Sequence, residues 1–145
     1  FGGVAVSIEH VGSTAVTGMS GKPTIDILVI VTSVQEVDAL NDAMIELGYA
    51  TLGDYVAENG RLFALEDHGK RLVNVHCFES AHLHVRQLIV MRDFLRTHSE
   101  ESEKYAQLKL DLYEKHPDDY VAYRAVKDPY LKEMQKRAFE WDENK

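Results

Sequence analysis

The chain has 145 residues, of which 45% are hydrophobic, and it carries a formal net charge of −8 at pH 7. Its length and apolar content predict a single domain over residues 1–145, strand-rich to about residue 80 and helical from about residue 81. The negative charge argues against nucleic acid as the main partner. One cysteine, Cys77, excludes an internal disulfide. No segment has the length of a signal peptide or a membrane span, so we expect a cytoplasmic protein without a membrane partner.

The first predicted element is a strand over residues 4–11, which is rich in β-branched residues and ends at Gly12, Ser13 and Thr14. Gly12 has no Cβ to keep a ligand from the backbone, and Ser13 and Thr14 offer hydroxyl and N–H groups to an anion. We therefore predict a tight, phosphate-binding turn at residues 12–14.

A buried central strand is predicted over residues 24–31, where the sequence TIDILVIV is almost continuously apolar. Asp26 interrupts this run. A lone carboxylate there is costly unless it lies at a strand end or in a cleft with a cation, hydrogen-bond donors or water. Lys22 stands before Pro23, just ahead of this strand. Its ammonium group either lies over a pocket and binds the ligand, or is a solvated loop charge.

The remaining elements follow from periodicity and from turn and cap residues. A helix is predicted over residues 34–47, with Ser33 as its N-cap, Glu36 as the capping-box partner and Gly48 as its stop. Three strands follow, over residues 49–56, 61–66 and 71–78. The rest is helical: from about His82 through Arg96, from a Ser99 cap to about Lys115, and after Pro117, with Pro129 expected to kink or split the last helix.

Several sequence blocks carry a family resemblance. HVGSTAVTGMSGKPTIDILV at residues 10–29 closely resembles the signature of the GrpB-like proteins, a family within the nucleotidyltransferase superfamily, and further blocks match at residues 71–79, 91–96 and 105–131. The resemblance covers essentially the whole chain. It implies an α+β fold, with a short mixed sheet, a helix after the second strand and a C-terminal helical segment. Family members usually carry an additional N-terminal segment, so this sequence is either a short form or part of a longer chain.

One departure from the superfamily pattern matters for chemistry. These enzymes generally place two carboxylates two residues apart after the Gly-Ser turn, on one strand face, with a third acid on a later strand; the pair binds two metal ions. Here the second position is Leu28, and the later strand offers Asn74 and His76. We therefore expect weak or undetectable nucleotidyl transfer.

The histidines and the cysteine separate into different predicted roles. Asn74 and His76 would project from one strand face near Asp26, as part of a site or as a satisfied polar pair in the core. His82 and His84 are two residues apart on a predicted helix, so they point about 200° apart and cannot share a metal. Cys77 faces the opposite side of its strand and is interpreted as a core residue.

The helical segment holds further candidates. Arg92 and Arg96 lie one turn apart with Asp93 between them, placed to bind a phosphate or carboxylate or to form an interhelical salt bridge. The resemblance points Tyr105, Lys109, Tyr123 and Lys127 toward the cleft, although periodicity alone would make the tyrosines core residues. Asp118 and Asp119 are interpreted as charges that complement a helix N-terminus.

The resemblance implies a nucleotide or another phosphorylated small molecule as ligand, bound between the Gly12-Ser13 turn and the C-terminal helices. An active enzyme would transfer a nucleoside monophosphate to a small acceptor at a degenerate metal site. Asp26 would hold Mg²⁺, Ser13 and Lys22 would hold phosphates, and His76 would act as base or ligand. The alternatives are a non-catalytic ligand-binding module, or a partner domain like the segment attached to some dephospho-coenzyme A kinases. The sequence fixes neither the acceptor, the nucleotide preference nor the oligomeric state.

Overall fold

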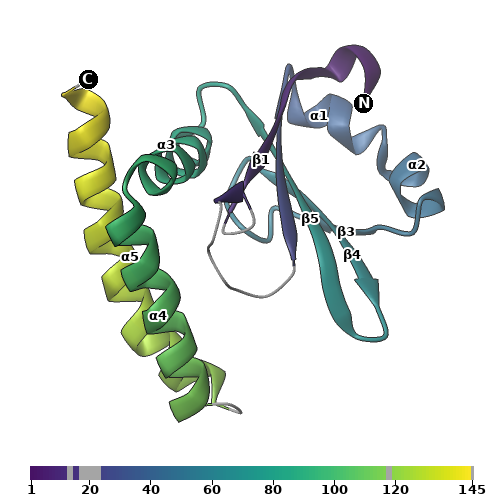
Figure 1. Ribbon diagram of the computed structural model, residues 1–145. Coiled ribbons are helices and arrows are strands. Elements are labelled where there is room, and N and C mark those ends of the chain that lie inside the picture. Colours follow the sequence, from purple (N-terminus) through teal and green to yellow (C-terminus); the bar gives the residue numbers. More distant parts are fainter. Residues whose placement is uncertain (13–14, 17–23, 117–118, 145) are drawn as a thin grey trace.

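A computed structural model describes residues 1–12, 15–16, 24–116 and 119–144, without the side chains of Tyr113, Tyr120 and Tyr123 (Figure 1). The chain begins with a short 3₁₀ helix, Gly2–Val4. The strands are β1 Ala5–Val11, β2 Ile25–Val31, β3 Ala50–Gly53, β4 Arg61–Asp67 and β5 Lys70–Glu79. The helices are α1 Val34–Asp38, α2 Asn41–Glu46, α3 Leu83–Thr97, α4 Ser99–Lys115 and α5 Tyr120–Glu143.

The strands form a mixed sheet in the order β1-β2-β5-β4-β3. Only the central pair, β2 and β5, is parallel, and the other neighbours are antiparallel. A connection from β2 to a parallel neighbour needs a crossover, and α1 and α2 lie within it, followed by the β3-β4 hairpin strands. The predicted α+β fold with a short mixed sheet is confirmed.

Each face of the sheet has its own apolar cluster. On one face, residues of β2 and β5 such as Val29 and Cys77 pack with Val37 of α1 and Met44 of α2. Burial raises the pKa of the Cys77 thiol to about 12, so this residue is a protonated core side chain, as its strand position predicted. The opposite face is covered by α3, and strand alternation places the side chains of residues 26, 28, 74, 76 and 78 on that face.

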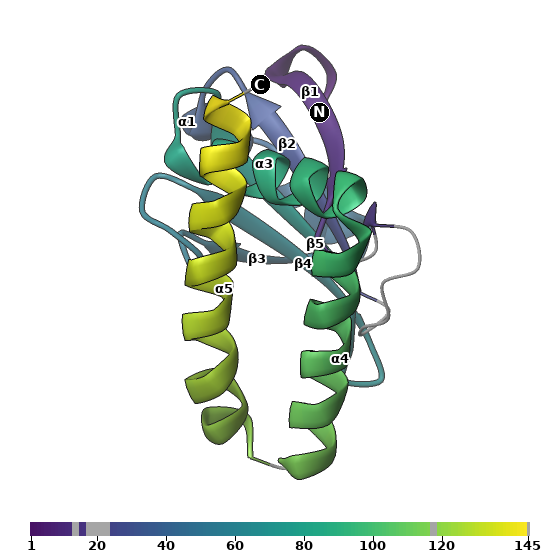
Figure 2. The same cartoon turned by 60° about the vertical axis from the view of Figure 1, so that its left-hand side comes forward.

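The C-terminal helices form a third layer. Figures 1 and 2 show α4 and α5 running side by side in opposite directions, next to α3 and extending away from the sheet. They share a cluster with α3 that includes Phe94, Tyr105, Met134 and Ala138, and Val16 joins it from the segment after β1. This cluster fixes the hairpin of α4 and α5 beside the β1 end of the sheet.

The predicted helix over residues 34–47 is two short helices instead. The break follows Asp38, whose carboxylate is drawn to Arg61 of β4 by hydrogen bonds of 2.6 and 3.0 Å. Ser33 is the N-cap residue of α1, as predicted, but its hydroxyl donates to Gln35 Oε1 at 2.8 Å and makes no hydrogen bond to the helix backbone, so the predicted capping box is wrong. The predicted stop is confirmed, since Gly48 adopts φ +97° after α2.

Pro129 does not split the last helix. The helix α5 continues through it from Tyr120 to Glu143, and beyond the proline Met134 and Ala138 pack in the cluster shared with α3 and α4. Asp119 caps α5, accepting from the backbone N–H of Ala122 at 3.0 Å, in agreement with its predicted N-terminal role; Asp118 lies outside the described residues.

Across the described residues, no helix combines the length and apolar character needed to cross a bilayer.

Candidate functional site

A polar cluster lies where β2 begins, beside the middle of β5. Asp26 of β2 stands beside Asn74 of β5 in the parallel register. Its Oδ1 accepts hydrogen bonds from Asn74 Nδ2 at 3.1 Å and from His76 Nε2 at 3.2 Å. The side chains of Asp26 and His76 are 25% and 14% exposed, so the cluster is partly buried but still reaches solvent. The expected proximity of Asp26, Asn74 and His76 is thus present.

The orientation of Asp26 is fixed through a chain of contacts across the sheet. Asn74 Oδ1 accepts from Arg71 Nη1 at 2.7 Å, and Arg71 Nε donates to Glu66 Oε1 at 3.0 Å. Because a guanidinium group can only donate, the amide oxygen of Asn74 faces Arg71 and its NH₂ group faces Asp26. No site role was predicted for Arg71 and Glu66. They are cross-strand neighbours on β4 and β5, two strands that were predicted.

The contact with Asp26 also assigns the ring nitrogens of His76. An ionised carboxylate only accepts, so Nε2 carries the proton that is donated to Asp26. In the neutral imidazole the lone pair is then on Nδ1, for which no hydrogen-bond partner is found among the described residues. His76 is therefore arranged to accept a proton or a hydrogen bond from a ligand.

Gly12 closes the other side of Asp26. It has φ +76°, and a Cβ built on it would lie 2.6 Å from Asp26 Oδ2. Only glycine brings the backbone this close to the carboxylate without strain. The side chain of Asp26 thus takes the space that a Cβ at Gly12 would need. The approach of a ligand to the backbone of Gly12 stays a prediction. Ser13, Thr14 and Lys22 lie outside the described residues.

Leu28, at the position of the missing second acid, lies on the same sheet face as Asp26 but is fully buried. It packs with Val11 and Phe78 beneath Val85 of α3. The described residues hold no group of three or more His, Cys, Asp or Glu side chains that could bind a metal ion. This donor set does not fit a two-metal centre. It fits one Mg²⁺ at most, with Asp26 as the only carboxylate ligand and the remaining oxygens from a ligand and water.

The two candidate arginines of α3 stabilise the segment around the site. Arg92 Nη1 lies 2.9 Å from Glu9 Oε2 on β1, and its Nε lies 3.0 Å from Asp93 Oδ1. The salt bridge therefore joins a helix to a strand, not two helices. Arg96 Nε donates to the carbonyl oxygen of Ala15 at 2.8 Å and lines a cavity of about 410 Å³ next to that segment.

His82 and His84 contact other parts of the fold, but the geometry expected for them is wrong, because His82 precedes α3 instead of lying on it and the two ring centroids are 5.3 Å apart. His82 precedes α3 and caps it, since its Nδ1 accepts from the backbone N–H of His84 at 3.1 Å. Its Nε2 donates to the carbonyl oxygen of Glu58 at 2.9 Å. The ring of His84 stacks on Phe78, and its pKa is lowered by burial and then by the nearby charges of His82 and His76.

We expect His82→Ala to lower the free energy of unfolding by about 1 kcal/mol, the usual cost of a lost N-cap, without changing ligand binding. His76→Ala should weaken ligand binding. Urea denaturation and calorimetry of both variants check this, and the reverse ranking would mean that the histidine roles are exchanged.

The candidates on α4 and α5 lie in the hairpin. Tyr105 is buried and stacks on Tyr130 with ring centroids 6.0 Å apart, in line with the core role that periodicity predicted. Lys109 Nζ lies 4.7 Å from the centre of the Tyr105 ring. Lys127 is close enough for its charge to lower the pKa of Lys109, after the larger effect of burial. The side chain of Tyr123 lies outside the described part of the chain.

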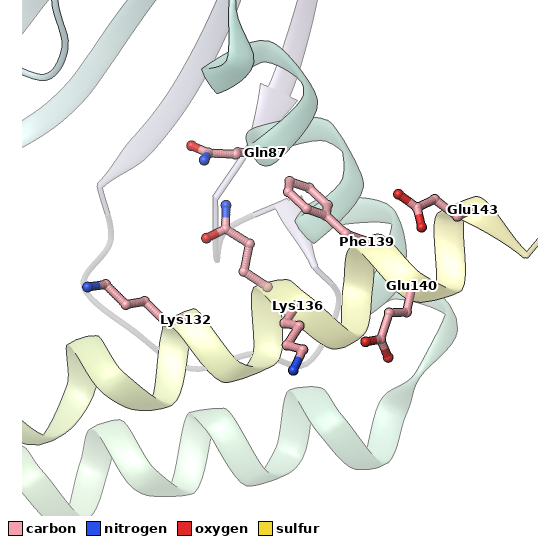
Figure 3. Close-up of a pocket in the computed structure, with 7 residues that line it drawn as sticks. Gln87, Lys132, Lys136, Phe139, Glu140 and Glu143 are labelled. Carbon is pink, nitrogen blue, oxygen red and sulfur yellow. The ribbon is translucent and has the colours of Figure 1, made fainter.

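A separate groove of about 340 Å³ lies between α3 and α5. Figure 3 shows that its labelled side chains, Gln87, Lys132, Lys136, Phe139, Glu140 and Glu143, do not converge on one point. Their charges are mixed, and none of the predicted site residues lines the groove. It offers no comparable chemistry to the Asp26 cluster.

Known proteins match this chain over most of its length. UPF0157 protein YqkA of Bacillus subtilis is 33% identical over 141 residues, covering 97% of this chain and 41% of YqkA, so the chain spans about two fifths of that relative. A crystal structure of the conserved protein GrpB from Enterococcus faecalis superimposes with a TM-score of 0.88 at 30% identity, covering 94% of this chain and 82% of that one. A dephospho-CoA kinase of Mycolicibacterium paratuberculosis is 26% identical over 162 aligned residues, covering 94% of this chain and 40% of the kinase.

The model of the GrpB protein family matches residues 2–137, which include every described residue of the Asp26 cluster. The chain belongs to the GrpB protein family.

Proposed function

We propose that this chain binds a phosphorylated small molecule, with a nucleotide as the first candidate, at the cluster of Asp26, Asn74 and His76 beside Gly12. The observation that carries the proposal is the partly exposed carboxylate of Asp26. Its Oδ1 accepts from Asn74 and His76, and its Oδ2 lies against the backbone of Gly12, which has a positive φ. A carboxylate with so many fixed neighbours is costly to build, which favours a functional role. The resemblance to nucleotidyltransferases supports the choice of ligand.

A single Mg²⁺ is part of the proposal. This ion is commonly held by one or two carboxylates together with substrate phosphates and water, so Asp26 can hold it only when the ligand is present. Once bound, Mg²⁺ would neutralise charge on the phosphate oxygens. The chain's own residues orient the ligand: Asn74 and His76 fix the carboxylate, and Gly12 brings its own backbone beside it.

Transfer of a nucleoside monophosphate to a small acceptor is the second candidate. The hydrogen bond from His76 to Asp26 favours it, because it leaves Nδ1 to take a proton from an acceptor hydroxyl. The buried Leu28 argues for weak activity, since the usual second metal ligand is replaced by a core residue. A non-catalytic module is supported by the match to dephospho-CoA kinases, where the similar segment is 40% of a longer protein.

A thermal-shift screen of nucleotides with and without Mg²⁺ tests the proposal. A triphosphate at about 100 times its dissociation constant should add about 2.7 kcal/mol, or roughly 5–10 °C in Tm, and Asp26→Asn should abolish most of this gain. The matched control is Asp54→Asn, an exposed aspartate in the segment between β3 and β4. Equal stabilisation of wild type and Asp26→Asn would contradict the proposal. Stabilisation that needs Asp26 but not Mg²⁺ would support the ligand site and reject the metal.

A further inference from the structure

The strand β1 forms an open edge of the sheet. In the sheet that the described residues form, β1 and β3 are the two edge strands. An edge strand directs the N–H and C=O groups of every second residue away from the sheet, where another strand can pair with them. β3 has only four residues and a register shift, whereas β1 has seven, with its own shift near its start, between Ala5 and Ser7. The regular part of β1, residues 7–11, is therefore the edge at which this sheet can be extended.

The exposed side chains of β1 include two large apolar ones. Val6 is 64% exposed and Ile8 is 62% exposed. Proline, lysine and other charged residues at an edge usually oppose association, but β1 contains neither proline nor lysine. Its one acidic residue, Glu9, lies 2.9 Å from the guanidinium group of Arg92 on α3. The edge thus presents apolar surface without an uncompensated negative charge, although the whole chain carries a net charge of −8.

We propose that the β1 edge binds the β1 edge of a second copy of this chain, in an antiparallel pair that joins the two sheets. The segment is self-complementary about Ile8. A two-fold axis perpendicular to the sheet at this residue places it opposite Ile8 of the partner subunit, and Ser7 opposite Glu9 of the partner subunit. Apolar side chains then meet apolar ones, and polar side chains meet polar ones. Each Glu9 carboxylate already has its own Arg92, so the copies meet without unpaired like charges at the edge.

The small size of this contact sets its strength. Pairing along one short strand buries less than the roughly 1,200 Å² that a stable interface buries, so we expect a weak dimer with a dissociation constant on the order of 10⁻⁴ M. The two copies also repel each other through their net charge of −8 each, and salt screens this repulsion. The dimer should therefore form at high protein concentration and become tighter as salt is added.

Analytical ultracentrifugation of the 145-residue chain tests the association. The weight-average mass should rise from 16.5 kDa toward twice that value as the concentration approaches about 1 mM. Ile8→Lys should weaken the dimer about ten-fold or more, because it places two like charges opposite each other, while urea denaturation stays near wild type because the side chain is mostly exposed. Val121→Lys, at an 80% exposed residue of α5, changes the net charge equally and should dimerise like wild type.

Disulfide trapping tests the register of the pair. Residues opposite each other in an antiparallel pair have Cα atoms about 4.5–5.5 Å apart, within the range of a disulfide. Ile8→Cys should therefore form a covalent dimer under air oxidation about ten-fold faster than Val121→Cys, or more. The native Cys77 does not interfere, because it is fully buried and burial raises the pKa of its thiol to about 12.

Three results would overturn the proposal. The first is a mass of 16.5 kDa at every concentration and salt level, and the second is equal crosslinking by the two cysteine variants. The third is a monomeric chain in which the β1 amide signals shift only when an extended apolar peptide is added. In that case the edge would bind a strand of another protein instead of a second copy.

Discussion

Leu28→Asp is expected to lower the free energy of unfolding by about 3–5 kcal/mol and to gain no affinity for Mg²⁺. The position shares a strand face with Asp26, and from the sequence alone a second acid there would complete the metal site. In the structure, however, the Leu28 side chain is fully buried with Val11 and Phe78 under α3. An aspartate would lose the apolar packing and place a carboxylate where no donor or metal can reach it.

Urea denaturation and Mg²⁺ calorimetry measure both parts of this expectation. Leu28→Met is the matched control, because a hydrophobic change of similar volume usually costs less than about 1.5 kcal/mol. If Leu28→Asp kept nearly wild-type stability and bound Mg²⁺ more tightly, α3 would have to move away from the sheet in solution. In that case the site would be larger than the Asp26 cluster.

Gly12→Val should cost about 2–4 kcal/mol of stability and should also remove ligand binding. Two effects add at this position. The backbone has φ +76°, which a β-branched residue adopts only with strain, and the new Cβ would lie 2.6 Å from Asp26 Oδ2. The carboxylate would have to leave Asn74 and His76, so the site would be lost even where the fold survives.

Gly69→Val separates the two effects. Gly69 lies in the β4-β5 turn with φ +77°, but a Cβ built on it meets no atom within 4 Å. It should therefore cost only the backbone strain, about 1–2 kcal/mol, and leave ligand binding unchanged. Denaturation and ligand titration of both variants provide the comparison. Equal stability losses together with equal binding would show that Gly12 is not packed against Asp26.

The sequence was sufficient for the features that depend on local pattern. Strand alternation placed Asp26 and Leu28 on one face of their strand and Asn74 and His76 on one face of theirs, and the apolar run at residues 24–31 indicated a central strand. Parallel pairing of β2 and β5 then brings those polar residues together. The capping role of Asp119 and the stop at Gly48 were also predictable, because both are set within a few residues of chain.

The features that were not predicted depend on long-range packing. The salt bridge of Arg92 to Glu9 joins residues 83 positions apart, and helical spacing alone cannot choose between a strand partner, a helix partner and a ligand. Coverage of Leu28 by α3 is a similar case. The spacing of Tyr105 and Lys109 showed that they share a helix face, but not that α5 would place Tyr130 against Tyr105.

The central claim is that the Asp26 cluster beside Gly12 binds the phosphorylated ligand, and amide chemical-shift mapping tests it most directly. A ¹⁵N-labelled sample is titrated with a nucleoside triphosphate and Mg²⁺. The largest shifts should occur at the backbone amides of Gly12, Asp26 and His76. Shifts confined to the groove between α3 and α5, around Gln87 and Phe139, or no shifts at all for any phosphorylated ligand, would contradict the claim.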